Sequence, residues 1–384
     1  MSEWKKVKLG EITSIKTGKL DSNAAVSNGI YPFFTCDPST LSIDKWAYDT
    51  EAILLAGNNA SGNYTAKYYK GKFNAYQRTY IIETLNPQFA SVRFMAYAMN
   101  QQLQLLKVMS TGSTTKFLTM KMLTQLTINL PQIEIQHRIA SILSRYDSLI
   151  ENYQKQIKLL EEAARRLYKE WFIDLHFPGH ENTKIVDGLP EGWERKKISD
   201  VCETVGGGTP STKVPAYYKG GRIKWVTPTD ITRNNCICLL DTDKKITEEG
   251  LRNSSTKMVP AGTILMTSRA SVGYFGIADF EVCTNQGFIS CIPIPNMQMY
   301  LLFNLMSRVD EIRQKAGGST YLEISKSVFR NFDIVCPSEI ILLQFQDKAS
   351  LVLKKENTLS LQIRLLTEAR DRLLPKLMSG EITV

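Results

Sequence analysis

A chain of 384 residues, of which 43% are hydrophobic, is long enough for two or more domains that each bury a core. Its net charge of +9 is compatible with a polyanionic partner but does not identify one. No run of about 18 apolar residues is present and the first residues lack a signal peptide, so we expect a cytoplasmic protein with no membrane partner. The seven cysteines contain no CxxC pair, which favours buried thiols over a zinc knuckle.

The chain opens with a stretch that returns later in the sequence. Residues 3–18 (EWKKVKLGEITSIKTG) align with residues 192–207 (GWERKKISDVCETVGG) at a shift of 189, with Trp4 over Trp193. Further pairs of stretches align at neighbouring shifts: 52–63 with 263–274, 75–81 with 284–290, and 112–131 with 318–337. Because the shift changes only between these stretches, we predict one unit present twice, with loops of different length.

Each unit is predicted to be a mixed α/β module. Runs rich in Val, Ile, Thr and Tyr and broken by Gly, Asn and Pro predict strands, for example over 262–268 and 288–295. Apolar residues at three-and-four spacing predict short helices over 91–107 and 297–314. The fold class is therefore α+β.

A long helix is predicted after each module, and the two helices share a repeated stretch, QIKLLEEAARRL (156–167) and QIRLLTEARDRL (362–373). A helix of about 35 residues is about 50 Å long, longer than such a module is wide, so we expect the helices to pack on each other as a coiled coil. The expected helix and subunit contacts are Ile139, Ile142, Tyr146, Tyr153, Ile157, Leu160, Leu167, Trp171, Phe345, Val352, Leu359, Ile363, Leu366 and Leu373.

Two charged residues, Glu356 and Arg370, interrupt the apolar seam of the second helix. They either meet a charged partner, mark a contact with another subunit, or lie where the seam is solvated. Between the first helix and the second module, residues 176–191 are rich in Gly, Pro and polar residues and are predicted to be a linker. His176 and His180 lie there around a proline without helical register, so no metal site is expected.

No catalytic site is predicted. The glycine-rich stretch 205–213 (VGGGTPSTK) lacks the spacing of a phosphate-binding loop and is better explained as a turn at a strand end. The pairs Glu3/Lys5 and Glu194/Lys196 lack the second carboxylate that a metal-dependent nuclease needs. The Asn/Asp-Pro-Pro-aromatic tetrapeptide expected of an adenine-methylating enzyme is absent as well.

Matched loops in the two modules carry polar and basic residues interleaved with aromatic ones. Arg, Lys, Asn and Gln side chains can read base edges by paired hydrogen bonds, while Ser, Thr and Lys suit phosphates. Taken singly, each such residue is more often a solvated loop residue. Loops that differ in sequence on frameworks that agree are what two specificities on one scaffold would look like.

The whole chain, from about residue 3 to 382, resembles the specificity (S) subunit of type I restriction-modification systems. The stretches that carry the resemblance are EWKKVKLGEI, LPEGWERKKISDV, LPQIEIQHRIASIL, LYKEWFIDLHFPG and LLPKLMSGEI. It implies target-recognition domains over 1–132 and 192–337, helices over 133–175 and 338–384 (the latter with the C-terminal tail) packed as an antiparallel coiled coil, and a linker over 176–191.

The resemblance also implies function and partners. Each recognition domain would read one half of a split double-stranded DNA target. The helices would set the spacing and bind two methyltransferase (M) subunits, which carry S-adenosylmethionine and methylate adenine. Restriction (R) subunits would add translocation and cleavage. The S subunit itself would catalyse nothing and hold no cofactor or metal.

The residues and the resemblance together give a set of expected DNA-binding residues. In the first module these are Lys19, Asn58, Asn59, Ser61, Tyr76, Gln77, Arg78, Thr114, Thr115 and Lys116. In the second they are Thr209, Lys213, Ser268, Arg269, Ser271, Asn285, Gln286, Ser319, Thr320 and Tyr321. Two rival functions stay open: a self-contained modification or restriction enzyme, and a coiled-coil scaffold that binds only proteins.

Overall fold

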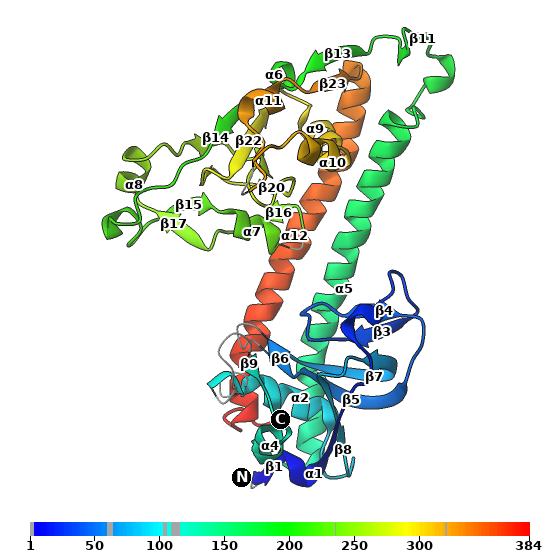
Figure 1. The fold of residues 1–384 in the computed structure, drawn as a ribbon, viewed down its shortest axis with the longest axis vertical. Helices are drawn as coiled ribbons and strands as arrows, with labels where there is room; N and C mark the ends of the chain where they lie inside the picture. Colours follow the sequence, from blue (N-terminus) through cyan, green and yellow to red (C-terminus); the bar gives the residue numbers. More distant parts are fainter. Residues whose placement is uncertain (1–3, 60–63, 103–105, 109–115, 235, 319–320) are drawn as a thin grey trace. The chain divides into compact units, whose positions relative to one another are not determined.

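The structure is a computed structural model that describes the chain except for residues 1–3, 60–63, 103–105, 109–115, 235 and 319–320. It divides into two compact units. Neither unit consists of one module followed by one complete long helix. The first unit comprises residues 1–149 and 366–384, and the second comprises residues 150–365. Both long helices contribute one segment to each unit (Figure 1).

The first unit is built around a six-stranded sheet of order β2-β8-β5-β7-β3-β4, in which only β3 and β7 are parallel. Two short pairs, β1 with β10 and β6 with β9, complete its strands. The elements in chain order are β1 (Lys5–Lys8), α1 (Leu9–Ile12), β2 (Thr13–Thr17), η1 (Ser22–Ala24), β3 (Tyr31–Phe34), β4 (Leu41–Ile43), β5 (Tyr48–Ala56), β6 (Asn58–Asn59), β7 (Ala66–Ala75), β8 (Thr79–Thr84), α2 (Val92–Gln101), β9 (Lys116–Phe117), α4 (Met120–Gln125), β10 (Thr127–Leu130) and α5 (Ile133–Phe172).

Strand β5 contains a continuous run of apolar residues, and its position in the sheet explains that run. Residues 52–55 are all buried, because alternate side chains enter two different cores. Ile53 and Leu55 join the core formed with α2, whereas Leu54 lies with Phe73 on the opposite face. The sheet is therefore covered on both faces along its centre.

The second unit repeats this framework. Its elements are η2 (His180–Asn182), β11 (Ile185–Val186), β12 (Leu189–Pro190), β13 (Glu194–Lys197), α6 (Ile198–Val201), β14 (Cys202–Gly206), η3 (Pro215–Tyr217), β15 (Ile223–Val226), α7 (Pro228–Thr232), β16 (Cys238–Leu239), β17 (Lys244–Ile246), α8 (Glu248–Arg252), β18 (Met258–Val259), β19 (Ile264–Thr267), β20 (Phe275–Ala278), β21 (Val282–Thr284), β22 (Phe288–Pro293), α9 (Gln298–Ser307), α10 (Val309–Gln314), α11 (Lys326–Arg330), β23 (Asp333–Cys336) and α12 (Glu339–Met378).

The predicted repeat is confirmed element by element. The series β1–α1–β2 returns as β13–α6–β14 at a shift of 189 (residues 5–17 and 194–206). Helices α2 and α9, and likewise α5 and α12, begin and end 206 residues apart (92–101 and 298–307; 133–172 and 339–378). The sheets differ, because the second unit has strand orders β14-β22-β19-β20-β16 and β17-β15-β21-β18 in place of one six-stranded sheet.

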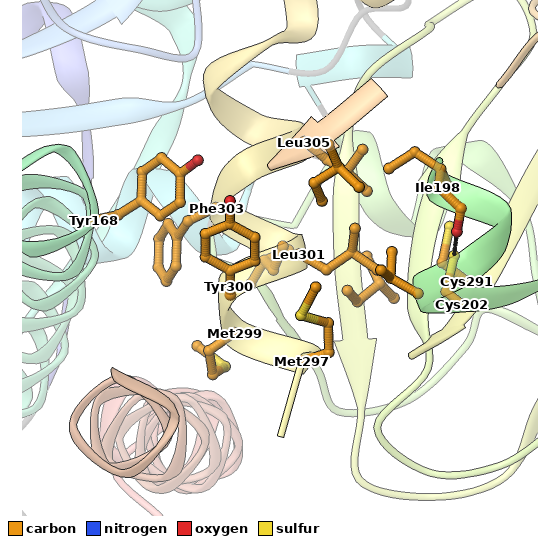
Figure 2. Close-up of a cluster of buried hydrophobic side chains, with 14 of the residues drawn as sticks. Tyr168, Ile198, Cys202, Cys291, Met297, Met299, Tyr300, Leu301, Phe303 and Leu305 are labelled. Atoms are coloured by element: carbon orange, nitrogen blue, oxygen red, sulfur yellow. Dashed lines mark hydrogen bonds between the residues drawn. The ribbon is translucent and has the colours of Figure 1, made fainter. Parts of the chain in front are cut away.

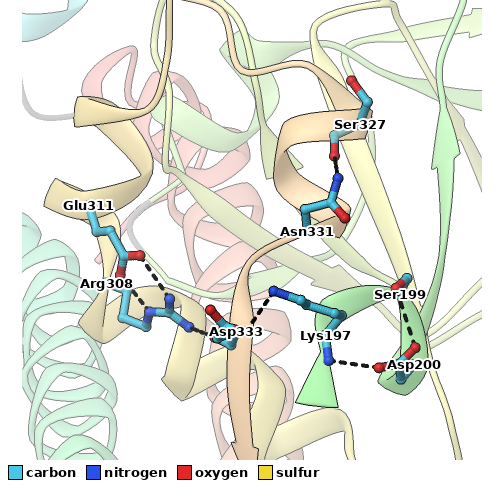
Figure 3. A network of polar contacts seen from close by, with 8 residues as sticks. All are labelled: Lys197, Ser199, Asp200, Arg308, Glu311, Ser327, Asn331 and Asp333. Carbon is cyan, nitrogen blue, oxygen red and sulfur yellow. Dashed lines mark hydrogen bonds and ion pairs between the residues drawn. The ribbon is translucent and has the colours of Figure 1, made fainter. Parts of the chain in front are cut away.

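The single helix predicted over 297–314 is two helices, α9 and α10, which are separated at Arg308. Its guanidinium donates two hydrogen bonds to the Glu311 carboxylate, of 2.7 and 2.9 Å, and a third to the backbone oxygen of Asp333 (Figure 3). The Asp333 carboxylate in turn accepts from the Lys197 ammonium at 2.7 Å, which holds the pKa of Asp333 below its usual value. This network joins α9, α10, β13 and β23.

Aromatic side chains join both long helices to the core of the second unit. Phe345 of α12 is fully buried, and its ring centroid lies 6.1 Å from Tyr168 and 4.9 Å from Phe172, both on α5. Tyr168 also faces Tyr300 and Phe303 of α9 (Figure 2). The last turns of α5 therefore lie beside the first turns of α12.

The first unit pairs the opposite ends of the same helices. Leu143 of α5 shares a core with Leu377 of α12, and Asp147 accepts a 2.7 Å hydrogen bond from Arg370. In each unit the helix segments are thus antiparallel. Of the expected contact residues, Ile139, Ile157, Trp171, Phe345 and Leu359 are buried, and Ile142, Tyr146, Tyr153, Leu160, Leu167, Val352, Ile363, Leu366 and Leu373 are half-buried.

The segment expected to be a linker has structure of its own. Residues 185–190 form the β11–β12 hairpin, whose turn residues Asp187 and Gly188 both have positive φ, 51° and 76°. Asp-Gly is a favoured pair for such a turn, so this signal was readable in the sequence. The Nδ1 atom of His180 lies 2.9 Å from the Phe177 carbonyl oxygen, which gives that imidazole a structural partner.

Glu356 is buried between the helices and the second module, with 1% of its surface exposed. The backbone N–H of Ile237 donates to its Oε1 at 3.0 Å and to Oε1 of Glu161 at 3.1 Å. Burial and the neighbouring Glu161 raise the pKa of Glu356 to about 9. The possibility that the seam is solvated at Glu356 is therefore wrong, because the residue is buried and shares the Ile237 N–H with Glu161.

The Glu356 pair predicts a pH-dependent stability. The folded chain binds a proton at Glu356 that the unfolded chain releases near the ordinary pKa of 4.5, so the free energy of unfolding falls as pH rises from there towards about 9. Glu356→Gln keeps an acceptor for Ile237 without a titrating group. At about pH 8 we expect the variant to be more stable than the parent by on the order of 2 kcal/mol, measured by thermal unfolding.

Glu368→Gln, at an exposed position of the same helix, is the matched control. It should leave the pH slope of the parent unchanged. Equal slopes for the parent and for Glu356→Gln would contradict the shared-proton pair.

Candidate functional site

Four segments of the first unit meet at one place, which we call the first loop cluster: residues 18–21, 57–59, 76–78 and 116–118. The backbone N–H of Gln77 donates to the Leu20 oxygen at 2.8 Å, and that of Gly57 donates to the Arg78 oxygen at 2.8 Å. Leu118 donates to the Gly57 oxygen at 2.9 Å, and β6 pairs with β9. These bonds bring together three of the loops expected to face DNA.

Side chains in the first loop cluster are held by specific partners. The Nε2 atom of Gln77 donates to Oδ2 of Asp21 at 3.4 Å. The Arg78 guanidinium lies 5.6 Å from the centre of the Phe117 ring, a distance at which a cation is attracted by the aromatic face. Beneath them the Tyr80 hydroxyl donates to the Leu118 oxygen at 2.8 Å, and burial raises the pKa of Tyr80.

The second unit has an equivalent second loop cluster: residues 207–209, 268–271, 285–287 and 321–324. The Ser268 N–H donates to the Gly287 oxygen at 2.8 Å, as Gly57 does to Arg78. The Ile324 N–H donates to the Ser268 oxygen at 3.0 Å, as Leu118 does to Gly57. The two clusters therefore share a hydrogen-bonded framework.

The side chains of the second loop cluster differ from those of the first. The Thr209 hydroxyl donates to Oε1 of Gln286, and Oδ1 of Asn285 accepts from the Gly287 N–H at 2.9 Å. Arg269 forms an ion pair with Glu323, with Nε 3.5 Å from Oε2. Tyr321 is 62% exposed at the edge of the cluster, so an aromatic face is open to a ligand.

Glycine at two equivalent positions allows each cluster to close. A Cβ atom on Gly18 would lie 2.0 Å from the Ala75 oxygen, and one on Gly207 would lie 1.9 Å from the Asn285 oxygen. No side chain fits at such distances. The turns after β2 and β14 can therefore approach the neighbouring loop only because residues 18 and 207 are glycine. The glycine-rich stretch 205–213 is accordingly the end of β14 and the turn that follows it.

All described members of the expected DNA-binding set except Lys213 fall in these two clusters. They are Lys19, Asn58, Tyr76, Gln77, Arg78, Thr209, Ser268, Arg269, Ser271, Asn285, Gln286 and Tyr321, together with the backbones of Asn59 and Lys116. Lys213 lies four residues after Thr209, outside the second loop cluster. Ser268 needs a correction: it is 3% exposed, so its side chain cannot reach a ligand, and it acts through its backbone. Outside the described residues lie Ser61, Thr114, Thr115, Ser319 and Thr320.

Three residues that no sequence pattern singled out contact the expected ones. Asp21 holds Gln77, Phe117 lies under Arg78, and Glu323 pairs with Arg269. None of these partners is close in sequence to the residue that it orients, so no local pattern marked them. The glycine pair was detectable, since Gly18 and Gly207 end the first aligned stretch.

Among the described residues, no group of three or more His, Cys, Asp and Glu side chains could hold a metal ion. A cavity of about 750 Å³ lies in the second unit beside Lys158, Glu161 and Arg364, and it is lined by charges of both signs. No helix in the described part of the chain is long and apolar enough to cross a membrane.

Comparison with known proteins identifies related sequences. A family profile described as "Type I restriction modification DNA specificity domain" matches residues 1–162 and 190–353, one match for each copy of the repeat. The EcoDI specificity subunit of Escherichia coli is 33% identical over 224 residues, 52% of this chain and 49% of that protein. The HindI specificity subunit of Haemophilus influenzae is 24% identical over an alignment of 464 positions that covers both chains completely.

Some matches span only part of the relative. The chain aligns with about half of the EcoDI subunit and with 35% of the MjaIX specificity subunit of Methanocaldococcus jannaschii, to which it is 39% identical over 153 residues. A crystal structure of a type I restriction-modification S subunit from M. genitalium covers 98% of this chain and 96% of its own, with a TM-score of 0.65 at 18% identity. That similarity confirms the fold.

The close approach at Gly207 predicts the effect of a single methyl group. Gly207→Ala must displace the 207–209 loop from Asn285, so we expect a loss of about 1–3 kcal/mol in the free energy of unfolding. Amide exchange at Gly208, whose N–H donates to the Thr284 oxygen at 2.9 Å, should accelerate. Gly317→Ala is the control, because beyond its own residue and its two chain neighbours no atom lies within 4 Å of its Cβ position. Equal stability of the two variants would refute the steric argument.

Proposed function

The chain belongs to the family of type I restriction-modification DNA specificity domains, and from this premise we propose that it is the DNA-recognition subunit of such a complex. In this proposal the chain performs no catalysis and carries no cofactor. Residues 1–132 and 192–337 each read one half of a bipartite double-stranded DNA target. The helices over 133–175 and 338–384 hold the two readers at a set spacing, and residues 176–191 link them.

One observation carries the proposal: the two loop clusters share backbone hydrogen bonds but present different side chains. Arg78 in the first cluster aligns with Gly287 in the second, and Gly57 aligns with Ser268. A common framework with exchanged side chains is suited to two unlike half-sites. Arg, Asn and Gln are side chains that distinguish bases in the major groove, and basic residues around them would contact phosphates.

The proposed complex also contains two methyltransferase (M) subunits, with S-adenosylmethionine bound to them, and restriction (R) subunits. Two exposed leucines support a pair of equivalent docking faces. Leu159 is 64% exposed and Leu365 is 54% exposed, and they occupy the same position of the repeated helix stretch, 206 residues apart. A partner present twice requires the same surface twice. We place this assembly in the cytoplasm, where its DNA target lies.

Half-site recognition can be tested by separate changes in the two clusters. Arg78→Ala should relax base preference in one half-site, and Arg269→Ala in the other, each by about tenfold or more, because each removes one reader. The measurement is methylation of a randomised target library by the complex of this chain with its M subunits. Arg252→Ala, an exposed arginine outside both clusters, should leave both half-sites unchanged. Loss spread evenly over both half-sites would contradict independent readers, and methyl transfer by the chain alone would overturn the proposal.

The docking faces can be tested by placing a charge on each exposed leucine. Leu159→Asp and Leu365→Asp should each weaken the binding of one M subunit by about tenfold or more, because a buried unpaired charge is costly at an interface. Mass photometry would show complexes with one M subunit in place of two. Leu351→Asp is the matched control: Leu351 is 65% exposed, yet its repeat position is Arg145, so it is not part of a repeated face. Retention of two M subunits by both variants would exclude these leucines.

A further inference from the structure

A fifth segment adjoins each loop cluster, and it follows a strand outside the aligned stretches of the repeat. Strand β15 pairs in parallel with β21, as β3 pairs in parallel with β7. Beyond each pair the backbone N–H of the cluster donates to the strand, from Asn285 to the Val226 oxygen and from Tyr76 to the Phe34 oxygen, both at 2.9 Å. The residues after β15, which form α7, and those after β3 therefore occupy equivalent places beside the two clusters.

Helix α7 connects the second loop cluster with a cavity. A Cβ atom on Gly287 would lie 3.2 Å from Cγ of Pro228, so α7 begins against the cluster. Its other end, with Thr229, Asp230 and Arg233, lines the cavity of about 750 Å³ together with side chains of α5 and α12. The five residues of α7 span only about 7 Å, so the cavity lies next to the cluster.

The acidic residue of α7 is engaged by the protein itself. Oδ2 of Asp230 accepts from the N–H and from the hydroxyl of Thr227, both at 2.7 Å. Its Oδ1 accepts from the N–H of Asp243 at 2.8 Å. Asp230 therefore has both carboxylate oxygens bonded and presents little negative charge to a ligand.

Two further acids of the cavity are paired with cations. Asp241 forms ion pairs with Lys224 and Lys245, at 3.7 and 3.5 Å. Glu161 pairs with Arg165 at 3.5 Å. Within the part of the chain that the structure describes, Asp243 is the one acid of the cavity lining whose carboxylate has no such partner.

The cations of the cavity lining are in the opposite situation. Lys158 of α5, Arg233 beside α7 and Arg364 of α12 are all exposed. Among the described residues none of these three side chains has a hydrogen bond, an ion pair or an aromatic ring as its partner. Three unpaired positive charges thus stand against the single unpaired carboxylate of Asp243, and the cavity suits a ligand that carries several negative charges.

Resting on the proposed function, we propose that this cavity binds the phosphate backbone of the DNA beside the second half-site. One strand of duplex DNA carries a phosphate about every 3.4 Å of helix axis, so the length of α7 corresponds to about two phosphates. Lysine, arginine and threonine are common donors to phosphate oxygens, and such contacts position a protein without reading a base. The leucines proposed to dock M subunits, Leu159 and Leu365, are not among the lining residues, which leaves the cavity to the DNA.

The equivalent segment of the first unit has different chemistry. Residues 35–40, which follow β3, contain no lysine or arginine. The nearby ammonium of Lys67 donates to the Asp37 oxygen at 3.4 Å and to the Thr40 hydroxyl at 3.2 Å, and burial lowers the pKa of Lys67. This cation is held within its own module, so we expect the phosphate contact beside the second half-site only.

The test removes the three free charges together. In the complex of the chain with its M subunits, the combined changes Lys158→Gln, Arg233→Gln and Arg364→Gln should weaken the binding of a target duplex. The plot of log K against log salt should become shallower by about 2 to 3, since each phosphate contact contributes about 0.9. Base preferences in both half-sites should stay as in the parent, because no base reader is changed.

A second triple variant is the matched control. Arg252→Gln, Lys315→Gln and Lys348→Gln remove the same total charge from exposed positions of the second unit that do not line the cavity. Its salt slope should stay close to that of the parent.

A change of the opposite sign guards against a folding defect. Asp243→Asn removes the one unpaired carboxylate of the lining, so we expect the complex to bind DNA about threefold more tightly. A poorly folded variant would not bind better than the parent. Asp187→Asn, at the exposed turn of the β11–β12 hairpin, makes the same change elsewhere and should have no effect.

Phosphate ethylation interference would locate the contact. Ethylation of adjacent phosphates on one side of the second half-site should block binding of the parent, and it should no longer matter in the variant without Lys158, Arg233 and Arg364. Interference around the first half-site should be the same in both.

The outcomes separate this inference from the function on which it rests. If the parent complex shows no sequence preference, the proposed function fails. If the parent is selective and the cavity variant keeps the parent salt slope and ethylation pattern, only the phosphate contact is overturned. Loss of an M subunit from the cavity variant before DNA is added, seen by mass photometry, would also overturn it, because the cavity would then be a protein docking site.

Discussion

The packing of α5 with α12 is the contact on which both units depend. Phe345 illustrates it in the second unit, where its ring lies among Tyr168, Trp171, Phe172 and Phe303 from two other helices. Leu377 and Met378 have the same role in the first unit, where they enter a core whose other buried residues all precede residue 150. Neither core is complete without a segment of each helix, so helix pairing is part of the tertiary structure of the modules themselves.

Two copies of one framework allow the backbone and the side chains to serve different purposes. The hydrogen bonds that gather the loops are repeated, down to the glycines at which a Cβ would collide with a carbonyl. The residues displayed on that framework are exchanged freely. The arginine near the Phe117 ring in one cluster has no counterpart in the other, where Arg269 pairs with Glu323. Such a division keeps the geometry of recognition constant while its chemistry varies.

Much of the fold was predictable because repetition is a signal that needs no long-range knowledge. The shifts of 189 and 206 located β1–α1–β2, α2 and both long helices in each copy, and the apolar spacing identified the helices themselves. Similarity between copies also located the loops of the candidate site. The split of the second sheet was not predictable, because strand order is decided by contacts between distant residues.

The partners of single side chains could not be predicted from the sequence either. Asp21 and Gln77 are 56 residues apart. Glu356 is 119 residues from Ile237, whose backbone N–H donates to both Glu356 and Glu161. A glutamate at a seam position could be solvated or paired, and only burial decides between them. The hairpin over 185–190 could have been predicted, because its Asp-Gly turn is a local signal. The many Gly and Pro residues around it led to the prediction of a linker.

The composition of the first unit has a consequence for synthesis on the ribosome. Residues 366–384 complete the first unit, whereas residues 150–365 contain the whole of the second. Translation proceeds from the N-terminus, so the module that emerges first is the one whose core is closed last. Until Leu377 and Met378 arrive, the core that contains Ile139 and Leu143 lacks the part that these two residues fill. The nascent chain must keep that apolar surface from aggregating for as long as the ribosome takes to synthesise the entire second unit.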